Sequence, residues 1–214
     1  MNNKDAEKTS FFDKTLTPIL DIYVSKIEDT GENLILPAAR EEEIRSISCE
    51  SVKKEKRYAF LLLRYAMEKS LGIKMEDVEF SRLDSGRWVC PVCEFSISHS
   101  SGWCAVAVSG ERVGVDIEKI VQPRAQDFAK RALSDEEFIK YSSLSAGDAL
   151  NYLILKWCEK ESAFKASDCN AFVPCETKTL NCSSRIIRLS DEEFALGICA
   201  KDISHMRIFE CEKM

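Results

Sequence analysis

The sequence predicts an α+β fold made of two halves that meet near residue 112. The prediction rests on the order of hydrophobic periodicities along the chain, which is helical, then strand-like, then helical, then strand-like again. No low-complexity linker separates the two parts, so we expect them to share an interface. We place an N-terminal half at residues 1–112 and a C-terminal half at residues 113–214.

The first half is expected to hold two helices followed by short strands. Pro37 opens a short helical segment that reaches about Ile47, and apolar residues at helical spacing predict a longer helix over 52–70 that stops at Gly72. The residues Asp84-Ser85-Gly86 lie between two strand-like runs and predict a hairpin. Further short strands are expected in the segments EFSIS and WCAVAVS.

The second half begins with a strand at residues 112–121 and then becomes helical. Ser134 opens the sequence Ser-Asp-Glu-Glu, which is a capping box and predicts the start of a short helix. A longer helix is expected over about 147–166. The remaining apolar segments, RIIRLS, FALGICA and HMRIFECE, are interpreted as antiparallel strands with polar breaks.

Composition narrows the class of protein. The chain has 214 residues, 45% of them hydrophobic and 31% charged, which is typical of a globular protein. The net charge of −6 argues against a general nucleic-acid binder, and the longest apolar runs are too short to span a bilayer. The polar N-terminal stretch MNNKDAEKTSFFDK lacks the apolar core of a signal peptide. We therefore expect a cytoplasmic monomer without a membrane or nucleic-acid partner, whose ten cysteines are mostly reduced thiols.

The segment RVGVDIEKIV alternates like a strand, yet it carries two carboxylates on one face. Gly114, Asp116 and Glu118 share that face, and branched apolar residues take the other. Neighbouring carboxylates repel each other unless a cation lies between them, and their oxygens suit a hard ion such as Mg²⁺. The glycine is expected to leave this face open to approach. The alternative is a solvated outer face, because exposed acidic residues are common.

A second acidic position lies in the helical segment KWCEKESAFKA. Leu153, Trp157, Glu161 and Lys165 follow one another at i+4 steps, with Phe164 beside them. A carboxylate in such an apolar stripe is costly to desolvate unless it is paired or binds a metal. An ordinary ion pair between Glu161 and Lys165 is the alternative, but it leaves the two aromatic residues unexplained.

His99 is one of only two histidines and ends a short strand between Ser98 and Ser100. Such a strand end offers several hydrogen-bond donors to a phosphate. The alternative is a structural histidine. The nearby pair Cys90 and Cys93 is either half of a zinc site completed by His99 or an incidental pair in a cysteine-rich chain.

Three of these stretches together, SISHS at 96–100, GVDIEK at 114–119 and WCEKESAFK at 157–165, resemble the motifs of the 4′-phosphopantetheinyl transferases. The similarity is to the larger, surfactin-synthetase-activating type, and it runs from about residue 37 to 170. The third motif is the most specific and is fully matched. Trp88 departs from the family pattern, which usually has proline after the glycine and the basic residue, and Ser96 replaces a frequent asparagine.

The resemblance implies a pseudo-dimer within one chain: two similar subdomains, each a small antiparallel sheet packed with a long helix, with the active site at their interface. It implies Mg²⁺-dependent transfer of the 4′-phosphopantetheine group of coenzyme A to a serine hydroxyl of an apo acyl or peptidyl carrier protein, with release of adenosine 3′,5′-bisphosphate. Two alternatives stay open, a non-catalytic protein that binds a carrier or coenzyme A, and a zinc-binding module built on Cys90 and Cys93.

Carried over by position, the resemblance implies three metal ligands: Asp116, Glu118 and Glu161. Lys165 is expected to contact the transferring phosphate. The attacking serine needs a base, and Glu161, in its apolar stripe, is the best candidate, directly or through water. Glu137 also lies in a family-like segment, but the capping box already accounts for it.

The resemblance also implies a site for the 3′-phosphate end of coenzyme A. Its residues are Arg87, Ser98 and His99. Arg57 and Arg64, two turns apart on one face of the predicted helix 52–70, are further candidates for the same anion or for the carrier protein.

Overall fold

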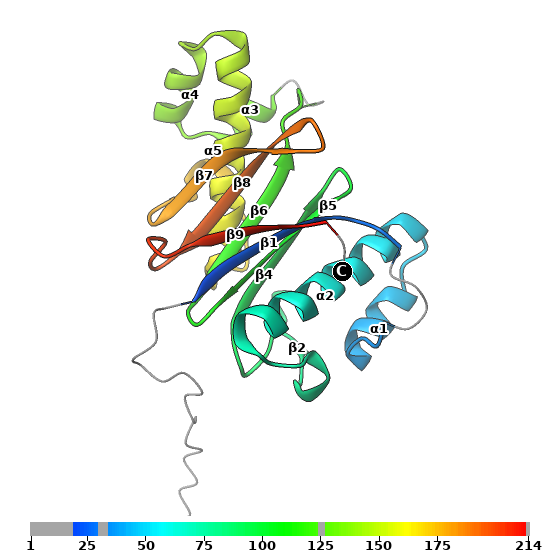
Figure 1. The fold of residues 1–214 in the computed structure, drawn as a ribbon. Coiled ribbons are helices and arrows are strands. Elements are labelled where there is room, and N and C mark those ends of the chain that lie inside the picture. The colour runs from blue at the N-terminus through cyan, green and yellow to red at the C-terminus, as the bar shows by residue number, and fades with distance from the viewer. Residues whose placement is uncertain (1–18, 30–33, 124–126, 213–214) are drawn as a thin grey trace, which may run out of the picture.

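Two β-sheets, each covered by one long helix, make up the fold in the computed structural model (Figure 1). The structure describes residues 19–29, 34–123 and 127–212, so the polar N-terminal stretch lies outside the described residues. The first sheet has the order β4-β5-β1-β9 and is formed by β4 (Glu94–Ser100), β5 (Trp103–Ser109), β1 (Leu20–Lys26) and β9 (Arg207–Cys211). The second has the order β6-β8-β7 and is formed by β6 (Val113–Lys119), β8 (Glu192–Ala200) and β7 (Cys182–Leu189).

The helices differ in length and in what they cover. The long ones are α2 (Glu50–Leu71) and α5 (Ala146–Ala166), and the short ones are α1 (Ala38–Arg45), α3 (Phe128–Ala132) and α4 (Asp135–Ser142). Single 3₁₀ turns occur at Met75–Asp77 and Pro174–Glu176. A short ribbon, β2 (Ser81–Arg82) with β3 (Trp88–Val89), follows α2.

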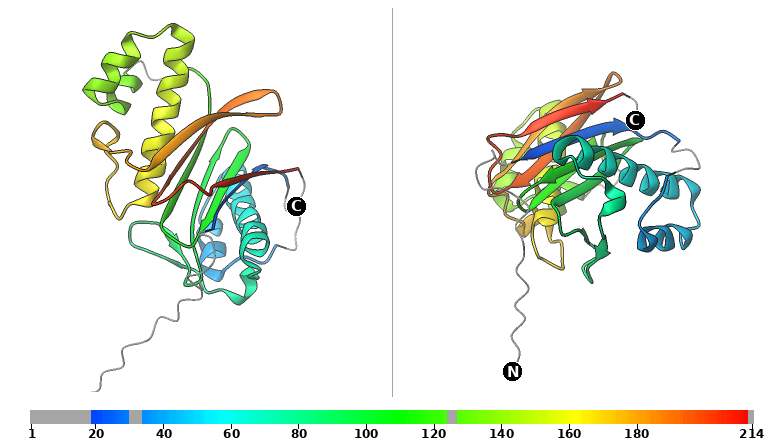
Figure 2. Two further views of the ribbon diagram at one scale, coloured as in Figure 1. Left: turned by 60° about the vertical axis from the view of Figure 1, so that its left-hand side comes forward. Right: turned by 60° about the horizontal axis from the view of Figure 1, so that its bottom comes forward.

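The sheets pack face to face between the two long helices. Apolar residues of β1, β5, β6 and β8 share one core between the sheets, while α2 packs on the outer face of the first sheet with a second core. Helix α5 lies on the outer face of the second sheet, against β6 and β8. Figures 1 and 2 show α2 and α5 on opposite sides of the sheets. The predicted α+β class is thus confirmed.

Several predicted elements are confirmed at nearly the expected positions. Helix α2 contains the predicted 52–70 segment and ends at Gly72, whose φ of 66° is the left-handed conformation that favours glycine at a helix end. Helix α5 matches the predicted 147–166. The capping box at the start of α4 is present: the Ser134 hydroxyl accepts from the Glu137 amide, and the Glu137 carboxylate accepts from the Ser134 amide.

Strand β1 and the pairing of β9 differ from the sequence interpretation. β1 was not predicted, although it lies inside the first sheet between β5 and β9. The HMRIFECE segment was expected to be antiparallel, but β9 pairs in parallel with β1. The reason is that the chain returns to the first sheet after β8, and such a pairing between distant segments leaves no local pattern. The division into halves at 112/113 stays a prediction, with β9 contributing to the sheet of the first half.

The glycine on the acidic face of β6 is required by the helix behind it. A Cβ added at Gly114 would lie 1.9 Å from the backbone oxygen of Ser162 on α5, and one at Gly197 of β8 would lie 2.4 Å from the oxygen of Cys158. The expectation that Gly114 leaves the face open is therefore wrong, because the α5 backbone occupies that space. These two glycines let α5 approach the second sheet closely enough to bring its side chains beside Asp116.

We expect Gly114→Ala to lower the free energy of unfolding by about 3 kcal/mol or more, because the new methyl group would force the backbones of β6 and α5 apart. The measurement is urea unfolding followed by circular dichroism. Gly147→Ala is the control, since an added Cβ meets nothing within 4 Å there and alanine favours a helix. Equal stability of Gly114→Ala and the wild type would show that the helix is not held at this distance.

The cysteines only partly follow the expectation of reduced thiols. Cys182 and Cys199 face each other across β7 and β8 and form a disulfide, which corrects the expectation for this pair. The other cysteines of the described residues are free thiols. Four of them are buried and pack as small apolar residues: Cys93, Cys104, Cys158 and Cys211.

No helix within the described ranges has the length and apolar character needed to cross a membrane.

Candidate functional site

Asp116 is the centre of a polar network buried between β6, β4 and α5. Its side chain points toward α5, as the alternation of β6 predicts, and the residue is only 3% exposed. Its Oδ1 accepts hydrogen bonds from the Ser98 hydroxyl at 2.7 Å and from the Lys165 ammonium at 2.7 Å. Its Oδ2 is buried and has no hydrogen-bond partner among the described residues. A buried carboxylate oxygen without a partner is costly, so this atom is ready to accept a donor or a cation.

Lys165 links α5 to both strands at this point. Its ammonium group also contacts the Ser98 hydroxyl at 3.1 Å and the backbone oxygen of Val115 at 3.2 Å. Its ion-pair partner is Asp116, and not Glu161 as in the alternative of an ordinary pair along the helix. Lys165 therefore neutralises Asp116 in this structure, and a cation that binds Asp116 would release the lysine charge for a ligand.

Glu118 and Glu161 lie within electrostatic reach of Asp116 and Lys165. Burial raises the pKa of Glu118, and the neighbouring Asp116 and Glu161 raise it further, against a hydrogen bond of 2.7 Å from the Ser100 hydroxyl. Burial also raises the pKa of Glu161, with Lys165 opposing and Asp116 adding to the shift. Both raised pKa values follow from partial burial of the carboxylates and from repulsion between them.

The apolar stripe beside Glu161 has its own partners. Trp157 packs against Phe128 of α3 and Phe172, with ring centroids 4.9 Å and 5.5 Å apart, and Phe164 packs against Phe172 at 5.1 Å. This aromatic cluster covers the side of α5 next to Glu161. It explains why aromatic and acidic residues alternate along one stretch of the helix.

The donor chemistry of this network fits a hard cation. Three carboxylates of one site, one with an unpartnered oxygen, supply the ligands that Mg²⁺ prefers. Within residues 19–29, 34–123 and 127–212, however, no three acidic, histidine or cysteine side chains already converge as a metal site. Lys165 stands beside Asp116 instead, so cation binding requires side-chain movement.

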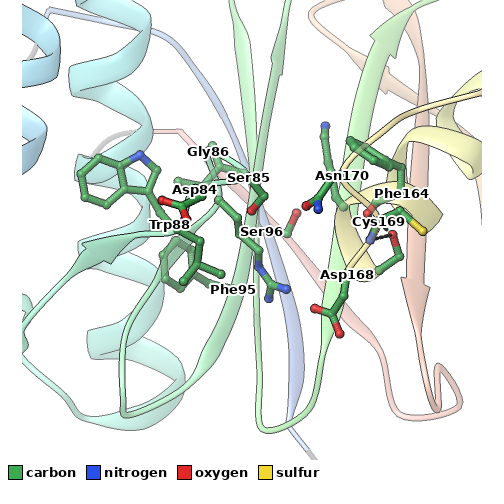
Figure 3. Close-up of a pocket in the computed structure, with 15 residues that line it drawn as sticks. Asp84, Ser85, Gly86, Trp88, Phe95, Ser96, Phe164, Asp168, Cys169 and Asn170 are labelled. Atoms are coloured by element: carbon green, nitrogen blue, oxygen red, sulfur yellow. Dashed lines mark hydrogen bonds between the residues drawn. The ribbon is translucent and has the colours of Figure 1, made fainter.

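A cavity of about 570 Å³ opens beside this network (Figure 3). One wall is formed by the hairpin at residues 83–88 and by β4. The other wall is formed by the end of α5, which includes Lys165, and by residues 167–170. Figure 3 shows Asp84, Ser85 and Gly86 facing Cys169 and Asn170 across it. Its size is within the range of small-molecule sites.

The wall formed by the hairpin is held by aromatic packing. Trp88 meets Phe60 of α2 edge-to-face at 5.4 Å, and the Arg40 guanidinium lies 4.5 Å from the Phe60 ring centroid. The tryptophan that departs from the family pattern thus anchors the hairpin on α2. Arg87 lines the cavity, and its guanidinium pairs with Glu94.

Ser98 and His99 point to opposite faces of β4, as neighbours in a strand do. Ser98 belongs to the Asp116 network, whereas His99 faces α2, with Nδ1 3.5 Å from a Glu55 carboxylate oxygen. Burial lowers the pKa of His99, with Glu55 opposing the shift and Lys165, Lys56 and Arg40 adding to it. The structure therefore separates these two residues into different surroundings.

The two arginines of α2 are engaged by acidic partners. Arg57 makes a bidentate pair with Glu41 of α1, with both distances 3.0 Å, and Arg64 lies 3.7 Å from Glu76. Neither contacts the Asp116 network. An anion that binds Arg57 would have to displace Glu41.

Sequence reasoning missed two features of this region, the links from the SISHS serines to β6 and the ion pair of Lys160. Ser96, Ser98 and Ser100 alternate along the edge of β4 and join it to β6 by hydrogen bonds: the Ser96 and Ser100 hydroxyls accept from the backbone amides of Val115 and Lys119. Lys160, within the third motif, is 1% exposed and pairs with Glu137 at 2.6 Å and with the backbone oxygen of Pro174 at 2.9 Å. The alternation of serines in SISHS is a sequence signal that could have predicted a polar edge of β4. No sequence pattern indicates that Lys160 pairs with Glu137.

The zinc alternative finds no support. Cys90 and Cys93 lie close together, but no third thiol, imidazole or carboxylate among the described residues completes a metal site with them. His99, the expected third ligand, faces Glu55.

Comparison with known proteins points to one family. The model of the 4′-phosphopantetheinyl transferase superfamily matches residues 112–206, which include β6 and α5. A Bacillus subtilis protein named 4′-phosphopantetheinyl transferase is 26% identical over 205 residues, which is 85% of this chain and 91% of the relative. The transferase Sfp of Bacillus subtilis (strain 168) is 29% identical over 108 residues, and gsp of Aneurinibacillus migulanus is 30% identical over 115 residues.

These last two matches cover about half of this chain, 49% and 53%, and 48% of each relative. The first relative extends the similarity over most of both chains. The family resemblance that the three motifs carry is confirmed by both kinds of comparison. The comparisons thus support the 4′-phosphopantetheinyl transferase superfamily for this chain, with relatives of the Sfp type.

Proposed function

We propose that this enzyme transfers the 4′-phosphopantetheine group of coenzyme A to a serine hydroxyl of an apo acyl or peptidyl carrier protein. The observation that carries the proposal is the buried Asp116 network, where Lys165 pairs with Asp116 and lies within electrostatic reach of Glu118 and Glu161, at the edge of a cavity of ligand size. A site for a small neutral ligand would not need buried carboxylates and a lysine at this position. The negative carboxylates suit a metal ion, and the positive lysine suits the pyrophosphate that the metal ion would accompany.

In the proposed reaction the serine oxygen attacks the β-phosphorus of the coenzyme A pyrophosphate. The P–O bond to the α-phosphate breaks, adenosine 3′,5′-bisphosphate leaves, and the serine proton passes to a base. Asp116, Glu118 and Glu161 would hold Mg²⁺, which would neutralise charge on the pyrophosphate. Lys165 adds positive charge near the transferring phosphate.

Glu161 is proposed as the base, directly or through one water. Burial raises the pKa of Glu161 above that of an exposed glutamate, in the direction of pH 7. A base with such a shifted pKa is better suited to proton transfer near neutral pH. Glu137 is a poorer candidate, because Lys160 and the α4 capping box already engage its carboxylate.

Coenzyme A is proposed to lie in the cavity, with its 3′-phosphate toward the basic side chains near the hairpin and α2. Arg87 lines the cavity, and His99 is close enough to Lys56 and Arg40 for these cations to lower its pKa. A phosphate among these groups would favour protonated His99. Arg57 and Arg64 remain further candidates for the carrier or for this phosphate.

We further propose that the chain is a pseudo-dimer of subdomains 1–112 and 113–214, with the active site where they meet, and that it acts as a monomer in the cytoplasm. The pairing of α2 with one sheet and α5 with the other supports this division. The contact of β4 with β6 in the Asp116 network supports the position of the site.

The direct test is incubation with coenzyme A, Mg²⁺ and a panel of apo carriers from fatty-acid, polyketide and peptide synthetases, followed by mass spectrometry. We expect at least one carrier to gain the mass of one phosphopantetheinyl group on a serine, and a chelator to stop the gain. If carriers bind but none gains mass, the protein is a non-catalytic carrier-binding member of the fold.

His99→Ala is expected to raise the KM for coenzyme A more than it lowers kcat. The 3′-phosphate is remote from the reacting phosphorus, so its contacts contribute to binding in the ground state and the transition state alike. Steady-state kinetics measure the split, and dephospho-coenzyme A is the control substrate. His99 has no part in holding the 3′-phosphate if the wild type uses both substrates equally well.

A further inference from the structure

The turn between β3 and β4 holds a pair of cysteines that the transfer reaction does not use. Cys90, Pro91, Val92 and Cys93 connect the cavity hairpin to β4. The Arg87–Glu94 ion pair brackets this turn, and Arg87 and Trp88 on its N-terminal side line the cavity. Proline restricts the backbone of the turn, so the two cysteines are held near each other.

The two sulfur atoms are already close. Cys90 Sγ and Cys93 Sγ are 3.7 Å apart, and the Cys90 thiol also lies 3.4 Å from the backbone oxygen of Cys93. A disulfide has its sulfurs about 2.0 Å apart, so rotation of side chains with a small shift of the turn is enough to close the bond. The geometry therefore permits a four-residue disulfide loop without unfolding.

The two thiols differ in exposure and acidity, which assigns them different roles. Cys90 is partly exposed, whereas Cys93 is buried. A hydrogen bond with the Cys93 thiol, together with backbone amides of the turn, lowers the pKa of Cys90 to about 7, and the same contact with burial raises the pKa of Cys93. An accessible thiolate beside a buried thiol is the arrangement of a dithiol that attacks with one sulfur and resolves with the other.

We propose that Cys90 and Cys93 form a redox-active dithiol that exchanges with small disulfides, such as a glutathione-type disulfide. The Cys90 thiolate attacks one sulfur of the external disulfide, which forms a mixed disulfide and expels one thiolate. Cys93 then loses its proton and attacks the Cys90 sulfur, which releases the second small thiol and closes the Cys90–Cys93 bond. Two protein thiols are oxidised, and one external disulfide is reduced to two thiols.

The proposal is independent of the transfer activity and goes beyond it. It also separates this pair from Cys182 and Cys199, which are already joined across β7 and β8 in the second sheet. Closure of the Cys90–Cys93 bond would tighten the turn that directly follows Arg87, Trp88 and Val89. The redox state of the pair is thereby coupled to one wall of the cavity.

The experiment treats the folded protein with oxidised glutathione at neutral pH, quenches it with acid, and maps the cysteines by tandem mass spectrometry. The wild type should lose two hydrogens within Cys90–Cys93, and dithiothreitol should restore them. In Cys93→Ser the reaction should stop at a glutathione adduct on Cys90. In Cys90→Ser the buried Cys93 should stay a free thiol.

Cys169, which is exposed and has no cysteine neighbour in the sequence, is the internal reference in each sample. The proposal is overturned if the wild type keeps both thiols under oxidised glutathione, or if Cys93→Ser carries no more adduct on Cys90 than on Cys169. Stoichiometric zinc bound by the pair in the purified protein would also overturn it. The wild-type map decides the question even if a serine variant does not fold, and none of these readouts requires a carrier protein.

Discussion

Asp116→Asn is expected to lower kcat/KM for carrier modification by about 10³-fold or more while the protein stays folded. Asparagine keeps the shape and the hydrogen bond with Ser98 but removes the charge that a cation on the pyrophosphate needs. The fold should tolerate the change, because Lys165 is 26% exposed at its side chain and can reach water when its partner loses its charge. Steady-state kinetics and thermal unfolding, measured on the same preparation, separate the two effects.

The matched control is Asp135→Asn, which changes an exposed aspartate at the start of α4. We expect it to retain wild-type kinetics. A near-normal rate for Asp116→Asn with Mg²⁺ would remove Asp116 from the metal site. A rate loss that only accompanies a large loss of stability would make the residue structural.

Glu161→Gln is expected to reduce kcat by at least about 10²-fold, which is the low end for general acid–base catalysis. Glutamine keeps the size of the side chain and one oxygen ligand, but it cannot take the serine proton. Binding of coenzyme A with Mg²⁺ should weaken far less, because Asp116 and Glu118 still offer ligands to the ion. Single-turnover kinetics and calorimetry of coenzyme A binding measure the two quantities separately.

Glu159→Gln is the control on the same helix, since Glu159 pairs with Lys156 and Ser184 away from the Asp116 network. It should leave kcat unchanged. If Glu161→Gln keeps the wild-type kcat, the base lies elsewhere. If binding falls together with the rate, Glu161 is chiefly a metal ligand and water bound at the site is the better candidate for the base.

The sequence predicted the parts of the site that depend on local periodicity. Alternation in β6 placed Asp116 and Glu118 on the face opposite the apolar core, and helical spacing put Glu161 beside Trp157. The long helices and the capping box at Ser134 were predictable for the same reason, since their signals lie within a few residues of each other.

The parts that could not be predicted depend on contacts between distant segments. The parallel pair of β1 and β9 joins residues 21–25 to residues 207–211. Neither segment contains a sequence pattern that identifies the other as its partner. Helical spacing offered Lys165 a pair with Glu161 one turn away as the alternative reading, but the close approach of α5 at Gly114 gives it Asp116 as its ion-pair partner. Ser98 and His99 are neighbours in sequence, and only the direction of β4 shows that one faces the carboxylates and the other faces α2.

The central claim is that the three carboxylates around Lys165 carry out the transfer, and the most direct test is the mass of an apo carrier after incubation with coenzyme A and Mg²⁺. The wild type is compared with the variant that combines Asp116→Asn, Glu118→Gln and Glu161→Gln. A second variant changes exposed acidic residues to amides at Asp135, Glu136 and Glu193. We predict that wild type and the second variant convert the carrier fully, by one phosphopantetheinyl group, while the first variant stays folded and leaves it unmodified. Conversion by the first variant at the wild-type rate would contradict the assignment of this site.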